Sequence, residues 1–101
     1  MFNVETKKGK IRIYFRHYQG IGLAPNGCKI KGQTLCVFEL NDNIVCTGAS
    51  FCSVHDNFNR DTGRKIALER ASDTFFWSRR DYDDHIKVAD AYINRRELIN
   101  A

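Results

Sequence analysis

The chain has 101 residues, of which 43% are hydrophobic, and a formal net charge of +4. This size fits a single domain over residues 1–101 with enough apolar side chains for a core. No N-terminal stretch is typical of a signal peptide, and no apolar run approaches the roughly 20 residues of a membrane span. We therefore expect a cytoplasmic protein without membrane contact, with reduced cysteines and a mild preference for acidic partners.

The first predicted element is a β-hairpin formed by residues 2–6 and 10–18, with Gly9 at a positive φ in the turn. Its second strand alternates strictly between two kinds of side chain. One face carries Ile11, Ile13, Phe15 and His17, and the other carries Lys10, Arg12, Tyr14, Arg16 and Tyr18. The first face is suited to a core, and the second to solvent or a partner.

Residues 19–32 hold four glycines and the only proline, which predicts a loop. Residues 33–41 and 44–54 are rich in β-forming residues and surround the polar run Asn41-Asp42-Asn43. This pattern predicts a second hairpin with a short turn.

From residue 60 the pattern predicts helices. Over 60–75, Ala67, Leu68, Ala71 and Phe75 share one face. After a bend at 76–78, residues 78–81 resemble a capping box. A second helix follows, with the apolar stripe Tyr82, Ile86, Ala89 and Ile93. Its first turn is acidic, and Arg95 and Arg96 lie near its end, both of which suit the helix dipole. The order predicts an α+β fold: an antiparallel sheet of about four strands, in two hairpins, with two C-terminal helices packed on one face.

The sequence offers little support for catalysis or metal binding. The four cysteines include no close pair of the kind found in structural zinc sites. Three of them, Cys36, Cys46 and Cys52, lie on the predicted alternating strands and fit buried, inert thiols. Cys52, His55 and Asp56 are neighbours in sequence, but strand alternation does not direct them into one cleft. No nucleophile elbow, P-loop or dinucleotide-binding glycine pattern occurs. We expect a non-enzymatic protein without a cofactor.

The basic-aromatic strand at 10–18 has two interpretations. Arg12, Tyr14, Arg16 and Tyr18 interleave cations with flat rings, which can stack bases and hold phosphates, or can contact an acidic protein. The same composition also suits a solvated sheet face, because tyrosine favours strands and charges discourage unwanted pairing.

The segment HDNFNRDTGRKIALERA (55–71) favours packing over phosphate binding. Gly63, Ala67 and Ala71 fall within one narrow arc of a helix and permit close approach to the sheet. Arg64 lies on the same inward side and needs a partner, for which Asp56 or Asp61 is available. We interpret these residues, together with Phe58 as a core plug, as structural.

The run from Cys52 to Ala71 resembles a segment common in small bacteriophage-encoded proteins, roughly C-x-x-x-D-x-F-x-x-x-x-G-x-x-[IL]-A-x-x-R-A. In this chain the matching positions are Cys52, Asp56, Phe58, Gly63, Ile66, Ala67, Arg70 and Ala71. The resemblance implies a phage origin. Small phage proteins without an enzyme motif often bind and block a host machine, and anti-CRISPR and other anti-defence proteins form one such class. By that analogy the leading hypothesis is stoichiometric inhibition of a host defence complex.

Three surfaces are candidates for the host protein or nucleoprotein partner. The first is the basic-aromatic strand. The second is the bend, with Phe76, Trp77, Arg79 and Arg80, because exposed Trp and Arg are favoured anchors, although Trp77 fits the core equally well. The third is the acidic turn of Asp81, Asp83 and Asp84, where carboxylates can mimic phosphates or simply complement the helix dipole. A small nucleic-acid-binding protein is the alternative function, and pairing into a homodimer stays open.

Overall fold

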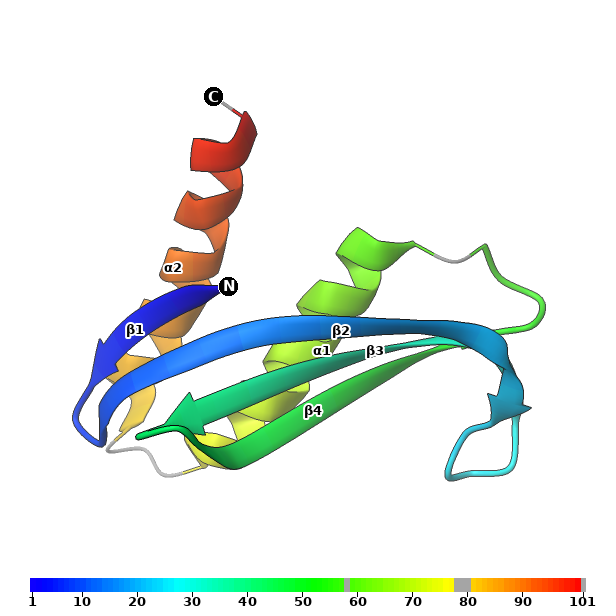
Figure 1. Ribbon diagram of the computed structural model, residues 1–101, viewed down its shortest axis with the longest axis horizontal. Helices are drawn as coiled ribbons and strands as arrows, with labels where there is room; N and C mark the ends of the chain where they lie inside the picture. Colours follow the sequence, from blue (N-terminus) through cyan, green and yellow to red (C-terminus); the bar gives the residue numbers. More distant parts are fainter. Residues whose placement is uncertain (58, 78–80, 101) are drawn as a thin grey trace.

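The computed structural model describes residues 1–57, 59–77 and 81–100, with side chains described as far as residue 94. Four strands precede two helices (Figure 1): β1 (Phe2–Thr6), β2 (Gly9–Leu23), β3 (Lys29–Leu40), β4 (Asn43–Ser53), α1 (Arg60–Phe75) and α2 (Tyr82–Asn100). The strands form one antiparallel sheet in the order β1-β2-β3-β4. The predicted α+β class, with both helices after the strands, is confirmed.

Two of the turns follow the predicted chemistry. Gly9 has φ +125° and closes the β1–β2 hairpin. Leu40 pairs with Asn43, so only Asn41 and Asp42 form the β3–β4 loop, with φ of 53° and 65°. Asparagine and aspartate tolerate this left-handed conformation, which matches the twist of a two-residue hairpin.

The prediction of a loop over 19–32 is wrong. Strand β2 runs on to Leu23 and β3 begins at Lys29, which leaves a turn at 24–28 held by backbone hydrogen bonds. The register of the two strands shifts between Gln19 and Gly22. Gly20, at φ +152°, lies in this shift. The glycines therefore accommodate a bulge within a long hairpin, a role that glycine often has in strands.

Both helices cover the same face of the sheet, and they lie behind the strands in Figure 1. Helix α1 packs on β4 and β3, whereas α2 packs mainly on β1. The core between the layers contains inward side chains of the strands and helices, among them Ile11, Ile13, Phe38, Leu68, Val88 and Tyr92. Neither helix covers the opposite face of the sheet, which we call the open face.

Helix α1 packs closely on the sheet at glycines, which have no side chain to hold the two elements apart. A Cβ built on Gly48 of β4 would collide with the backbone of α1 at Ala67 and Ala71, and both alanines are fully buried. A Cβ on Gly63 would lie 2.6 Å from Thr34 Oγ1. Through these contacts the small residues of α1 lie close to the sheet. The helix begins after Asn59, whose side chain accepts a hydrogen bond from Thr62 N–H.

The expected apolar stripe of α2 does not face the core. Tyr82, Ile86 and Ile93 are exposed by 66%, 42% and 53%. The buried face instead contains Asp84, Val88 and Tyr92, and the Tyr92 ring packs against Phe2 and Phe15 at centroid distances of 6.1 and 5.8 Å. Because the carboxylate of Asp84 lies at the start of this buried face, a pattern of apolar residues alone does not identify the face.

Candidate binding face of the sheet

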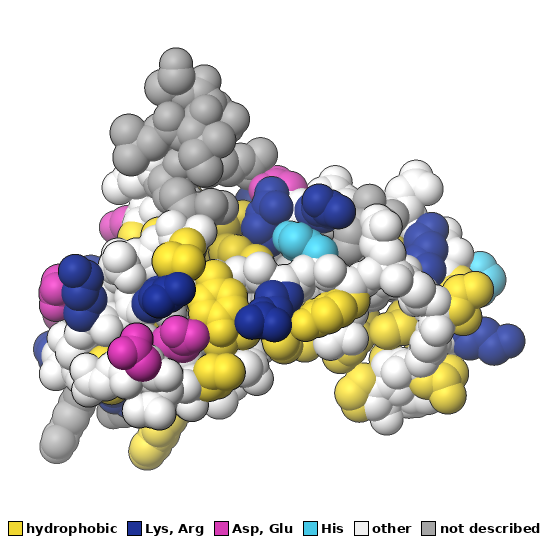
Figure 2. All heavy atoms as spheres, viewed as in Figure 1, with side chains coloured by type: hydrophobic (Ala, Val, Ile, Leu, Met, Phe, Trp, Pro, Cys, Tyr) yellow, Lys and Arg dark blue, Asp and Glu magenta, His cyan; other side chains and the backbone are white. Residues whose placement is uncertain are grey.

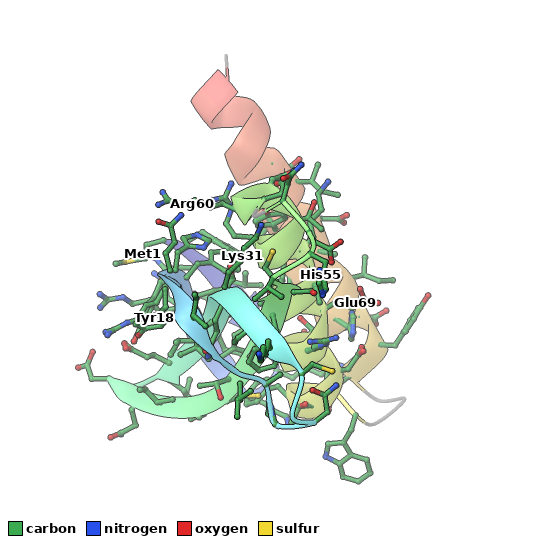
Figure 3. The ribbon with its side chains drawn as sticks, turned by 90° about the vertical axis from the view of Figure 1, so that its right-hand side faces the viewer. Met1, Tyr18, Lys31, His55, Arg60 and Glu69 are labelled. Carbon is green, nitrogen blue, oxygen red and sulfur yellow. The ribbon has the colours of Figure 1, made fainter. Side chains whose placement is uncertain are left out.

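The predicted outward residues of β2 lie on the open face. Their inward neighbours Ile11 and Ile13 are fully buried, so strand alternation turns Arg12, Tyr14, Arg16 and Tyr18 away from the helices. Figure 3 shows Tyr18 pointing away from both helices. Figure 2, which views this face, shows basic side chains alternating with hydrophobic ones along the band where β2 runs.

Arg16 lies between two tyrosines of its own strand. Its guanidinium carbon is 5.6 Å from the centroid of the Tyr14 ring, which is within cation–π range. Hydrogen bonds to Tyr18 and Tyr14 raise the pKa of Arg16. The cation thus lies beside flat rings on an exposed part of the strand.

The strands beside β2 extend this surface, and the sequence alone did not show how. Tyr18 lies opposite Gln33 of β3, which lies opposite the exposed Phe51 of β4. This rung therefore places one aromatic ring on either side of an amide. Lys10 is opposite Glu5 and Arg12 is opposite Glu39, whereas Arg16 is opposite Leu35. Alternation along residues 44–54 predicts which face of the sheet Phe51 lies on. Only the register of the strands shows that it is level with Tyr18.

The aromatic bend is divided between core and surface. Trp77 is 82% exposed, so the alternative that placed it in the core is wrong. Phe76, in contrast, is buried and packs against Phe75 and Phe38 at centroid distances of 4.9 and 6.3 Å. Its assignment to a contact surface is therefore corrected. Arg79 and Arg80 lie outside the described residues, as does Ser78 of the capping box.

The acidic turn is mostly structural. Asp84 was predicted to contact a partner, but it is fully buried, and its Oδ2 accepts a hydrogen bond from Lys7 N–H at 3.1 Å. That bond ties the β1–β2 turn to α2, so Asp84 is not available to a partner. Asp81 lies 3.8 Å from Lys8 Nζ, which also donates to the Phe75 carbonyl at 3.1 Å. Asp83 alone of the three is exposed.

Arg64 has one of its two predicted partners. Its Nη2 lies 3.9 Å from Asp61 Oδ1 within α1, and the side chain is 29% exposed. The neighbouring His17 contacts Thr34 Oγ1 at 2.9 Å. Burial, followed by the charges of Arg64 and Arg60, lowers the pKa of His17. Phe58, the predicted core plug, lies outside the described residues.

The described residues do not assemble the Cys–His arrangement considered for catalysis. Cys52 Sγ donates to the backbone carbonyl of Asp56 at 3.6 Å, and His55 is exposed on the loop after β4 (Figure 3). A pocket of about 290 Å³ lies beside these residues and the start of α1, and Ser50, one of its lining residues, donates to the Gly63 carbonyl at 2.8 Å. Thr34 also lines this pocket, and its hydroxyl is the one that contacts His17 at 2.9 Å.

Two thiols, Cys36 on β3 and Cys46 on β4, have raised pKa values. Burial raises the pKa of Cys36 to about 12 and also raises that of Cys46. Among the residues whose placement is described, no three His, Cys, Asp or Glu side chains converge as a metal site requires. Neither helix, over its described part, is long and apolar enough to cross a membrane.

Comparison with known proteins gives one match. No curated protein and no solved structure matches the chain. One family model matches residues 6–87, a range that extends from the end of β1 into α2 and so includes most of the open face. The chain therefore belongs to the phage protein family described as N4 Gp49/phage Sf6 gene 66.

Proposed function

We propose that this phage protein acts without catalysis, by stoichiometric binding to a host defence complex such as a CRISPR–Cas assembly in the host cytoplasm. The open face makes the contact. The observation that carries the proposal is the exposed Arg16 held between Tyr14 and Tyr18 on a sheet face that neither helix covers.

Three properties of this face suit a protein partner. Arginine and tyrosine are enriched among the residues that dominate binding energies. They stand here on paired strands, so little conformational freedom is lost when a partner binds. The basic side chains of β2 complement an acidic surface, which favours rapid and specific association.

The test is capture of a partner from nuclease-treated host lysate by the tagged protein. Arg16→Glu should weaken the affinity for the captured protein at least about tenfold, because it reverses a central charge. The matched control is Arg60→Glu, which makes the same change of charge on the helical side of the molecule. Equal capture by both variants would exclude the open face.

The rung of Tyr18, Gln33 and Phe51 favours a second candidate, binding of single-stranded nucleic acid in phage replication or regulation. Aromatic side chains on a sheet can stack successive bases, while the neighbouring arginines hold phosphates.

Fluorescence anisotropy with labelled single- and double-stranded oligonucleotides tests this candidate. Binding should weaken steeply with salt, and removing one phosphate-contacting cation should reduce the slope by about one. Arg12→Glu combined with Arg16→Glu should abolish binding. No affinity at low ionic strength, or an unchanged affinity of the double variant, would rule this candidate out.

A further inference from the structure

Helix α2 has a second apolar face that nothing in the described structure covers. We call it the outer stripe; its members are Tyr82, Ile86, Ala89 and Ile93. All four side chains are exposed. Val88 and Tyr92, on the other side of the helix, already provide the contact with the sheet. The outer stripe is therefore not needed to attach α2 to its own domain.

The spacing of the outer stripe is that of a helix pair. Its members follow one another at intervals of four, three and four residues, the repeat with which two helices interlock side chains along a seam. A helix with the same spacing is the natural complement of such a seam. A second copy of this chain supplies that helix.

The shape of the molecule leaves room for a partner helix. Figure 1 shows α2 rising away from the sheet toward its C-terminal end, so its outer side is not hemmed in by strands. The outer stripe is about 16 Å long. It belongs to the layer of helices, whereas the open face is the other side of the sheet, so pairing through α2 would leave both open faces free.

We propose that two copies of the chain pair through the outer stripe, with α2 packed antiparallel against α2 of the second copy. In this arrangement Ile86 of one copy meets Ile93 of the other, and Ala89 lies near the two-fold axis. An isologous contact of this kind closes on itself and stops at a dimer.

Charge complementarity selects the antiparallel orientation. The first turn of α2 contains Asp83, and the sequence just before its last turn contains Arg95 and Arg96. Antiparallel pairing sets the acidic start of one helix opposite the part of the other whose sequence holds Arg95 and Arg96, and it also opposes the two helix dipoles. Parallel pairing would instead place Asp83 of one copy beside Asp83 of the other, so that like charges would meet.

The small size of the outer stripe sets the expected affinity. Four side chains from each copy bury much less than the roughly 800 Å² per partner of a standard stable interface. The dimer should therefore be weak, with dissociation in the micromolar range or above, and its population should depend on concentration.

Sedimentation equilibrium over about 5 to 500 µM protein tests the pairing. We expect the average mass to rise from monomer toward dimer for the wild type, and to stay at monomer for Ile86→Asp and Ile93→Asp. Both positions are exposed, so circular dichroism spectra of the variants should match the wild type. The matched control is Ile21→Asp, at an isoleucine that is 87% exposed on β2, which should dimerise normally.

A wild type that stays monomeric over this range would overturn the proposal, and would be the result if the outer stripe serves a different protein. Dimerisation that persists in Ile86→Asp would overturn it equally. Neither result depends on whether the open face binds a host complex.

Disulfide trapping tests the orientation. Two differently tagged proteins, Ile86→Cys and Ile93→Cys, each with Cys28→Ser to remove the exposed native thiol, are mixed and oxidised. Antiparallel pairing predicts a cross-linked product that contains both tags. Cross-linking of Ile86→Cys only to itself would contradict the antiparallel arrangement.

Discussion

Helix α1 lies against the sheet where side chains are missing, at Gly48 and Gly63, while α2 lies against it through large side chains and one buried carboxylate. The α1 contact brings backbone close to backbone, and a single added methyl group has no room at Gly48. The α2 contact consists of the Tyr92 ring between Phe2 and Phe15, together with the hydrogen bond from Lys7 N–H to Asp84.

This difference separates two kinds of attachment. A contact made by glycine brings two backbones together and cannot adjust to a larger residue, because backbone atoms cannot repack around an added group. A contact made by rings can adjust through side-chain rotamers and tolerates substitution better. The α1 half of the domain should therefore be the more sensitive to small changes, while α2 needs only one face for attachment and has the outer stripe to spare.

The largest predicted effect is that of Gly48→Ala, which should break the α1 attachment. The new Cβ would overlap the backbone of α1, so we expect the free energy of unfolding to fall by about 3 kcal/mol. The thermal midpoint should drop by roughly 10 °C or more. Thermal and urea unfolding followed by circular dichroism would measure both quantities.

Gly22→Ala is the matched control, because a Cβ at Gly22 would have no atom within 4 Å. Its free energy of unfolding should stay within about 0.5 kcal/mol of the wild type. Similar losses for the two variants would mean that α1 is not held by close backbone approach.

A smaller effect is expected for Asp84→Ala, which attacks the α2 attachment. Loss of the carboxylate leaves Lys7 N–H without its acceptor, at a cost of about 1–2 kcal/mol in the free energy of unfolding. Asp84→Asn keeps an acceptor oxygen and should recover part of that loss. Asp83→Ala, at the exposed neighbouring position, should cost only a few tenths of a kcal/mol. Equal losses for Asp83→Ala and Asp84→Ala would show that the helix dipole, not the buried contact, explains the acidic turn.

The two helices also differ in how well the sequence predicted them. The arc of Gly63, Ala67 and Ala71 identified the inward face of α1, because only close backbone contact requires small residues at that spacing. For α2 the same wheel pointed outward. The apolar outer stripe looked like a core face, while Asp84 stood at the head of the true one. Burial of an aspartate depends on a partner 77 residues away, which local periodicity cannot reveal.

The sheet shows the same limit. Alternation within β2 correctly placed Arg12, Tyr14, Arg16 and Tyr18 on one face, since side-chain direction on a strand is a local property. The glycines at 20 and 22 were read as a loop because their bulge becomes visible only when β3 is paired with β2. The alignment of Tyr18 with Phe51 likewise depends on the registers of two hairpins. The sequence therefore predicted the outward residues of β2, but not which residues of the neighbouring strands lie beside them.

The smallest predicted effect is at His17 of β2, whose pKa is lowered by burial and by the charges of Arg64 and Arg60 on α1. Its folded-state pKa is below the ordinary value of 6.5, so between those two values the unfolded chain binds more protons than the folded one. The free energy of unfolding should therefore fall as pH drops through 6.5 toward the folded-state pKa, and this contribution should be constant below it. Urea unfolding of the wild type and of His17→Gln across this range isolates the contribution of His17, with His55→Gln as a control at an exposed loop position.

Because the charges of Arg64 and Arg60 assist the shift, Arg64→Gln should bring the NMR-measured pKa of His17 closer to 6.5. If the free energies of unfolding of wild type and His17→Gln changed with pH in parallel, the folded protein would not disfavour a charged His17. The close contact of α1 with the sheet would then not extend to this histidine.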